Sequence, residues 1–313
     1  MVFLFIQCNI ISIDHTTAKM YIHFVLFATA AAILGVTNGA GWDPSKFQYD
    51  AGPNYTLVWQ DEFENVGPSK AVIDGAPAYA PNPKNWSPQQ GNIDGGIQNY
   101  TDSIYNAYVQ NNQLHIVAMK DNYTSGMLSS AGLQEFTYGK FVAKIRMPYG
   151  QGIWPAWWIL GNAYKEYYFY WPTVGNIDIA EMIGGKSNDQ TVHGSVSWNA
   201  AANSMNPIIE GNVESTWKTP DQSLLHNNSL VYWSEWNTTH IVTGVNEFIV
   251  TSFATKHIPN SINPVMAFHG LWSYNMILNV AIGGTKAGPP DNTTVWPQEM
   301  VVDWVRVYQL KCS

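Results

Sequence analysis

The stretch "TVHGSVSW" (Thr191–Trp198) decides the fold class, because polar and apolar side chains alternate along it with the period of a β-strand. Successive side chains of a strand point to opposite faces of its sheet. One face carries His193, Ser195 and Ser197, and the other carries Val192, Val196 and Trp198. We therefore expect one face to lie in a core and the other to be open and polar.

Similar runs recur along the chain, separated by Gly, Pro and Asn. They predict strands at residues 55–63, 113–120, 138–147, 152–160, 176–183, 191–198, 240–253, 276–284 and 300–309. Many strands of similar length with turn signals between them are typical of two packed antiparallel sheets. No linker or repeat interrupts the pattern, so we predict an all-β sandwich or jelly roll formed by a single domain, residues 41–313.

The composition excludes several classes of partner. The 313 residues carry a net charge of −8, with 15 Lys and Arg and no basic run, so nothing favours nucleic acid or an anionic membrane surface. The chain has 14 Trp and 17 Tyr. A polar, aromatic sheet face suits an extended hydrated polymer, and the simplest such polymer is a polysaccharide.

The N-terminal region has the features of a targeting segment. "YIHFVLFATAAAILGV" (residues 21–36) is an apolar run preceded by Lys19 and followed by small residues up to Ala40. We interpret residues 1–40 as an extension with a signal peptide, and Met20 as an alternative start; a membrane anchor is the competing interpretation. Seven N-x-S/T sequons agree with secretion: Asn54, Asn85, Asn99, Asn122, Asn227, Asn237 and Asn292.

The expected mature protein is therefore extracellular or associated with a cell wall, without a membrane contact, and monomeric. After cleavage only Cys312 remains, so the fold must rest on core packing rather than on a disulfide.

The stretch "NIDIAEM" (residues 176–182) carries the chemistry. Strict alternation would send Glu181 to the face opposite Asn176 and Asp178. A β-bulge around Ile179 and Ala180 would bring Glu181 back, and bulges are common beside active sites. Retaining glycosidases need two carboxyl groups about 5 Å apart, one to attack the sugar and one to protonate the leaving oxygen. The two ends of this strand could supply them.

The chain resembles glycoside hydrolase family 16, in its laminarinase-like branch. The resemblance rests on the bulged-strand signature and on "VWQDEF" (58–63), "YGKFVAKIRMPYGQGIWPAWWIL" (138–160) and "ILNVAIGGTKAGPPDNTTVWPQEMVVDWVRVYQ" (277–309). It implies a jelly roll of the concanavalin A-like lectin and glucanase type, and retaining endo-hydrolysis of β-1,3- or mixed-linkage β-glucans.

Carried over residue by residue, the family's acid/base falls on Glu181, its assisting carboxylate on Asp178 and its nucleophile on Asn176. An Asn amide is a poor nucleophile and cannot balance an oxocarbenium-like transition state. Hydrolysis should therefore be very weak. Three alternatives stay open: Asp178 attacks instead, Asn176 positions a water for an inverting route, or the codon is misread.

Aromatic residues near the motif are expected to bind sugar. In the resembling family, aromatics of this region line the sugar subsites, which implicates Trp154, Trp158 and Trp171, with a place in the core as the alternative for each. Trp157 has the opposite parity from Trp154 and is expected in the core.

Three further residues match positions at the family's cleft. His193 is expected to line it near the acid/base, with a buried structural His as the alternative. Gln98 and Tyr100, in "IQNYTD", match a stretch at the cleft edge. Asn99 between them is a sequon, and a glycan there would obstruct the groove.

A structural calcium is the one metal that the resemblance suggests, and the chemistry requires no cofactor. Asp303 alternates in phase with Val301 and Val305, so we expect a carboxylate on an apolar face. Many family members hold calcium with such an Asp and an acidic residue near the chain start, here Glu62 or Asp61. A hydrogen-bonded or Arg-paired Asp303 is the alternative.

Three functions follow. The first is a secreted β-glucan-binding homologue whose chemistry is lost or strongly reduced. The second is an active endo-β-1,3(4)-glucanase. The third is a structural wall or matrix protein that uses the sandwich as a scaffold, which the retained carboxylates and tryptophans argue against.

Overall fold

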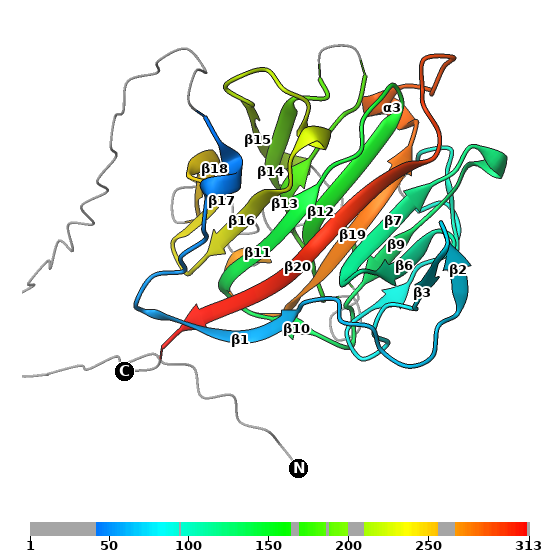
Figure 1. Cartoon of the computed structure of the whole chain (residues 1–313). Helices are drawn as coiled ribbons and strands as arrows, with labels where there is room; N and C mark the ends of the chain where they lie inside the picture. Colours follow the sequence, from blue (N-terminus) through cyan, green and yellow to red (C-terminus); the bar gives the residue numbers. More distant parts are fainter. Residues whose placement is uncertain are drawn as a thin grey trace, which may run out of the picture.

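The computed structural model describes residues 42–93, 95–163, 169–185, 188–199, 210–255 and 267–311. The predicted signal peptide lies outside these residues. None of the helices in the described ranges is long and apolar enough to span a membrane. Two large antiparallel sheets stack face to face, which confirms the predicted all-β sandwich (Figure 1).

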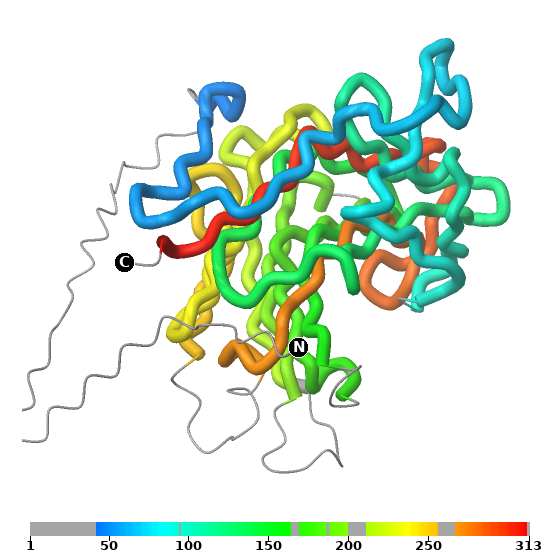
Figure 2. Tube along the Cα trace, turned by 90° about the horizontal axis from the view of Figure 1, so that it is seen from below, coloured from blue at the N-terminus to red at the C-terminus, as the bar shows by residue number. Residues whose placement is uncertain are grey.

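We call the first sheet the outer sheet. Its strands, in spatial order, are β18 (Phe248–Ala254), β17 (His240–Val245), β16 (Leu230–Trp236), β11 (Gly139–Arg146), β20 (Gln298–Leu310), β7 (Gln113–Ala118) and β6 (Ala107–Gln110), and β1 (Tyr55–Asp61) also pairs with β20. The first and last strands of the described chain therefore lie side by side, as Figure 2 shows.

We call the second sheet the groove sheet. Its strands, in spatial order, are β15 (Glu210–Lys218), β14 (Thr191–Asn199), β13 (Asn176–Glu181), β12 (Ile153–Gly161), β19 (Tyr274–Ile282), β9 (Met127–Ser129) and β4 (Ser87–Pro88), and β10 (Glu135–Phe136) also pairs with β19.

The remaining elements are short. They are the pairs β2 (Ala71–Ile73) with β3 (Ala76–Ala78) and β5 (Asn99–Tyr100) with β8 (Thr124–Ser125), the 3-10 turns η1 (Pro44–Lys46), η2 (Asp121–Tyr123) and η3 (Leu225–Asn227), and the helix α3 (Gly284–Ala287).

The core lies between the two sheets, and strand alternation decides which side chains enter it. On β14, Val192, Val196 and Trp198 belong to the core, as the sequence predicts. On β12, Trp157 is fully buried in the core, which confirms its predicted parity. The alternate residues of both strands are left for the far face of the groove sheet.

One predicted strand is wrong. Residues 240–253 form two strands, β17 and β18, in which Val245 pairs with Phe248 across a tight turn. Asn246 takes a positive φ of 47°, which Asn tolerates better than most residues. Its side-chain oxygen accepts a bond from Val231 N (2.9 Å), so the turn is fixed against β16.

A second correction concerns Asp303. The register between β11 and β20 shifts at this residue, because Lys144 pairs with Trp304 while Ile145 pairs with Val302. The bulge breaks the alternation with Val305 and turns the Asp303 carboxylate away from the core. The expected carboxylate on an apolar face is therefore absent at this position.

Candidate active site

The bulge predicted on β13 is present. Against β14, Asp178 pairs with Ser195 and Glu181 pairs with His193, so two residues of β13 face one residue of β14. Against β12, Trp158 pairs with Asp178 and Trp157 pairs with Ala180. Ile179 and Ala180 are both buried in the core. The bulge thus returns Glu181 to the face that carries Asn176 and Asp178.

Asn176 begins β13 and is 5% exposed. Its Oδ1 accepts a hydrogen bond from Trp171 Nε1 (2.8 Å), and its Nδ2 donates to both oxygens of Asp178 (3.0 Å each). The two polar atoms of the amide therefore both have protein partners. Trp171 itself is 51% exposed, so its indole covers Asn176 from the solvent side.

Asp178 lies between Asn176 and Ser195, whose Oγ also donates to its carboxylate. Burial, and next the negative charge of Glu181, raise the pKa of Asp178 from 3.8 to about 7. The hydrogen bonds from Ser195 and Asn176, together with the charge of Lys286, act in the opposite direction. Asp178 is therefore a carboxyl group that changes charge near neutral pH.

Glu181 ends β13 and is 5% exposed. Trp154 Nε1 donates to its Oε1 (3.0 Å), and Lys286 Nζ contacts its Oε2 (3.3 Å). Each carboxylate oxygen thus accepts from a nitrogen donor. Both donors come from outside β13, Trp154 from β12 and Lys286 from α3.

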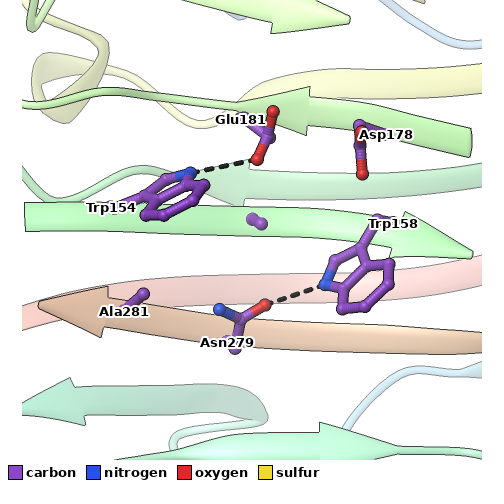
Figure 3. A pocket seen from close by; sticks show the side chains of 7 residues that line it. Trp154, Trp158, Asp178, Glu181, Asn279 and Ala281 are labelled. Atoms are coloured by element: carbon purple, nitrogen blue, oxygen red, sulfur yellow. Dashed lines mark hydrogen bonds between the residues drawn. The ribbon is translucent and has the colours of Figure 1, made fainter. Parts of the chain in front are cut away.

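A hollow of about 150 Å³ opens in front of these carboxylates (Figure 3). Its lining consists of Trp154, Ala156, Trp158, Asp178, Glu181, Asn279 and Ala281. Two predicted sugar-binding tryptophans therefore flank the two retained carboxylates. Aromatic rings beside carboxylates offer apolar surface for sugar C–H groups and acceptors for sugar hydroxyls.

Gln98 and Tyr100 lie beside this hollow, and each is 1% exposed. Tyr100 Oη accepts from Asn279 Nδ2 (3.0 Å), and Asn279 Oδ1 accepts from Trp158 Nε1 (2.9 Å). Gln98 Oε1 accepts from the backbone N of Ile282 (2.9 Å). The structure thus places both residues in contact with β19 rather than in the lining of the hollow.

His193 lies on the groove face of β14 beside Glu181, and its Nδ1 contacts Glu214 Oε1 (2.7 Å). Glu214 is on β15, a strand that the sequence pattern does not predict. A third carboxylate therefore reaches this face through the imidazole of His193.

The sequence prediction misses three residues of this site: Glu214, Asn279 and Lys286. Asn279 has a signal, because it is the one polar side chain between Ile277 and Ala281 on one face of a predicted strand. Lys286 follows the strand in a Gly-rich stretch of sequence, where α3 forms, and no periodic pattern marks it.

The predicted metal ligands Asp303 and Glu62 both bind cationic side chains. Lys144 Nζ lies 2.9 Å from Asp303 Oδ2, and Gln113 Nε2 donates to Oδ1 (2.6 Å). Arg306 holds Glu62 through Nε (2.7 Å) and a terminal nitrogen (3.0 Å). These contacts fit the alternative of a paired Asp303, and the structural calcium stays a prediction. Among the described residues, no three His, Cys, Asp or Glu are grouped to hold a metal.

A β-sandwich with two carboxylates on one bulged strand, flanked by tryptophans in an open hollow, has the architecture of a glycoside hydrolase. Comparison with known proteins narrows this class. The model of glycosyl hydrolases family 16 matches residues 97–306. The chain belongs to this family, as its resemblance predicts.

Relatives of this chain include known glucanases. A beta-glucanase of Rhodothermus marinus is 30% identical over 270 residues, which are 83% of this chain and 87% of the relative. The X-ray structure of the laminarinase from Rhodothermus marinus superposes with a TM-score of 0.68 at 30% identity, covering 82% of this chain and 98% of that one.

A third comparison concerns a ligand complex. A LamA variant from Zobellia galactanivorans, solved with laminaritriose and laminaritetraose, superposes with a TM-score of 0.63 at 28% identity and covers 81% of this chain and 99% of that one. The relatives of this chain thus include laminarinase-type endo-1,3-β-glucanases, and one similar structure holds β-glucan oligosaccharides.

Proposed function

We propose that this chain is a β-glucan-binding member of family 16 in which retaining endo-hydrolysis is lost or strongly reduced. The ligand is a β-1,3- or mixed-linkage β-glucan bound along the groove sheet. Asn176 is the observation that carries the proposal, because it occupies the position at which the family places its attacking carboxylate.

The contacts of Asn176 support the proposed loss of hydrolysis. The amide is neutral, and its oxygen and nitrogen already bind Trp171 and Asp178. An amide held in this way has little freedom to position a water for an inverting route. Asp178 and Glu181 also lie on one strand and one face, so a water between them would have poor access to the opposite face of the sugar.

An active enzyme that attacks through Asp178 is the second candidate. Asp178 is a carboxyl group on β13, the strand that also carries Asn176 and Glu181. Its raised pKa leaves it partly protonated at neutral pH. A protonated carboxyl is a weak nucleophile, and its oxygens accept from both Asn176 and Ser195. These contacts disfavour attack by Asp178 relative to binding without turnover.

A purely structural role is the third candidate. A structural role does not require carboxylates and tryptophans in the groove. Trp154, Trp158, Asp178 and Glu181 nevertheless line one hollow together. We further propose that the protein is secreted, on the strength of its N-terminal apolar run and its sequons.

Binding to laminarin tests the ligand class. We expect the unaltered protein to bind laminarin, and Trp158→Ala to weaken the affinity by about fivefold or more, since the loss of a stacking aromatic costs on the order of 1 kcal/mol. Trp304→Ala is the matched control, because Trp304 is a partly exposed tryptophan of the outer sheet that stacks on Arg306. Equal affinities of both variants, or no binding by the unaltered protein, would contradict the proposal.

A further inference from the structure

Lys286 is a residue of the groove that the family signature does not explain. It lies in α3, directly after β19, and its ammonium contacts Glu181 Oε2 (3.3 Å). The same ammonium lies 5.6 Å from the centroid of the Trp154 ring. The Lys286 side chain is 39% exposed, whereas that of Glu181 is 7% exposed. The lysine therefore covers the acid/base position from the solvent side.

The ammonium is surrounded by negative charge. Burial favours the neutral amine, but Glu181, Glu214 and Asp178 together raise the pKa of Lys286. Lys286 is thus fully charged at neutral pH. An ammonium carries three donors and no acceptor, so the oxygen that it contacts must serve as an acceptor.

A general acid has the opposite requirement. In the first step of retaining hydrolysis, a carboxylate attacks the anomeric carbon, the bond from that carbon to the glycosidic oxygen breaks, and the acid transfers its proton to this oxygen. Glu181 would need a proton on Oε1 or Oε2. Trp154 donates to the first oxygen and Lys286 to the second, so a proton on either oxygen would leave that oxygen a poorer acceptor for the N–H donor it faces.

We propose that Lys286 is a positioning residue that holds Glu181 as a hydrogen-bond acceptor, and that it is a second barrier to hydrolysis beside Asn176. This inference rests on the proposed function. It implies that restoring the attacking carboxylate with Asn176→Glu gives little activity while Lys286 remains in place. It also assigns Glu181 a different task in this chain, which is to accept a hydrogen bond from a sugar hydroxyl.

The test compares laminarin hydrolysis by Asn176→Glu with that of the double variant Asn176→Glu/Lys286→Met. Met keeps an apolar stem over the Trp154 ring and removes the charge. We expect the double variant to have a kcat about tenfold or more above the single variant, within the range of general acid catalysis, with KM changed less than about threefold. The variant Asn176→Glu/Lys286→Arg keeps the charge and should remain as slow as Asn176→Glu.

Lys144→Met in the Asn176→Glu background is the matched control. Lys144 pairs with Asp303 on the outer sheet, and its side chain is also 39% exposed. We expect it to leave the kcat of Asn176→Glu unchanged. A double variant with Lys286→Met that is no faster than Asn176→Glu would overturn the inference, whether both variants are active or both are inactive.

A measurement without catalysis tests the contact itself. Glu181 is the first of the charges that raise the pKa of Lys286, so Glu181→Gln should lower that pKa in a side-chain NMR titration. An unchanged value would overturn the inference. Binding of laminarin by the unaltered protein separates the two proposals, because its failure removes the proposed function, whereas binding without the expected gain in kcat removes only the role of Lys286.

Discussion

Asp178 shows how strongly single residues of the groove depend on their neighbours. Burial and the adjacent Glu181 raise its pKa to about 7, while Asn176 and Ser195 stabilise its charged form through hydrogen bonds. A Glu at position 176 would remove the amide donor and add a charge. Asn176 therefore simplifies the electrostatics of the strand at the same time as it removes the attacking group.

The raised pKa of Asp178 predicts a pH dependence of stability. The folded state binds this proton more tightly than the unfolded state, whose carboxyl titrates near 3.8. The contribution of Asp178 to the free energy of unfolding is therefore fully present below that value and is lost as the pH rises through about 7. The expected loss is on the order of a few kcal/mol.

Asp178→Asn isolates this contribution, because it removes the titrating group and keeps the shape of the side chain. We expect the difference in free energy of unfolding between the unaltered protein and Asp178→Asn to change as the pH rises from 3.8 to about 7, in favour of the variant at higher pH. Urea unfolding at a series of pH values measures this difference. A difference independent of pH would show that Asp178 is not perturbed.

The residues found from the sequence are those that a repeating pattern or the family resemblance marks. Asn176, Asp178 and Glu181 lie on a strand with a recognisable spacing, and His193 lies on the clearest alternating run. Glu214 reaches His193 only because β15 pairs with β14, and Lys286 reaches Glu181 from α3. Such contacts depend on the packing of separate segments, so local patterns do not contain them.

At the scale of elements, the bulge of β13 positions the acid/base. The spacing of the polar residues predicts it, because Glu181 could otherwise not share a face with Asp178. The second bulge, at Asp303, is not predicted from the sequence, because Val301 and Val305 continue the alternation on either side. A bulge can thus be predicted from a sequence when a polar residue breaks the alternation of the strand. It cannot be predicted when the residues on either side of it continue the alternation.

Deletion of Ala180 tests the bulge of β13. Two residues of β13 now face one residue of β14, so removing one of them restores a regular ladder and leaves Glu181 on the groove face. We expect the deletion variant to fold with a loss of less than about 2 kcal/mol, since only a small side chain leaves the core. Denaturant unfolding measures this loss.

Deletion of Ile177 is the control from the same strand. It puts Asn176 directly before Asp178, which sends one of these polar side chains into the core and also removes a buried Ile. We expect this variant to lose several kcal/mol or fail to fold. Equal stability of the two deletion variants would contradict the role assigned to the bulge.

At the scale of the molecule, the two sheets divide the tasks. The outer sheet joins the first and last described strands, β1 and β20, and holds Asp303 and Glu62 in pairs with basic side chains. The groove sheet presents the hollow on its far side from the core. The architecture could be predicted from alternation alone, because each large strand buries one face. The β17–β18 turn and the strands β15 and β16 could not, since their sequences lack a clear break or a clear period.

Family membership and the altered strand lead to different expectations for the whole molecule. The family and its laminarinase relatives favour hydrolysis of β-glucan, whereas Asn176 and the contacts of Glu181 favour binding without cleavage. We expect the second behaviour of this chain, binding without cleavage. This expectation concerns the unaltered protein, so no variant is needed to decide it.

Incubation of the unaltered protein with laminarin separates binding from hydrolysis. Bound polysaccharide is measured by calorimetry, and new reducing ends and released oligosaccharides are measured in the same mixture over time. We predict saturable binding with no oligosaccharide above the protein-free background. Release of laminari-oligosaccharides at an ordinary enzymatic rate, about 1 per second or faster, would contradict the account.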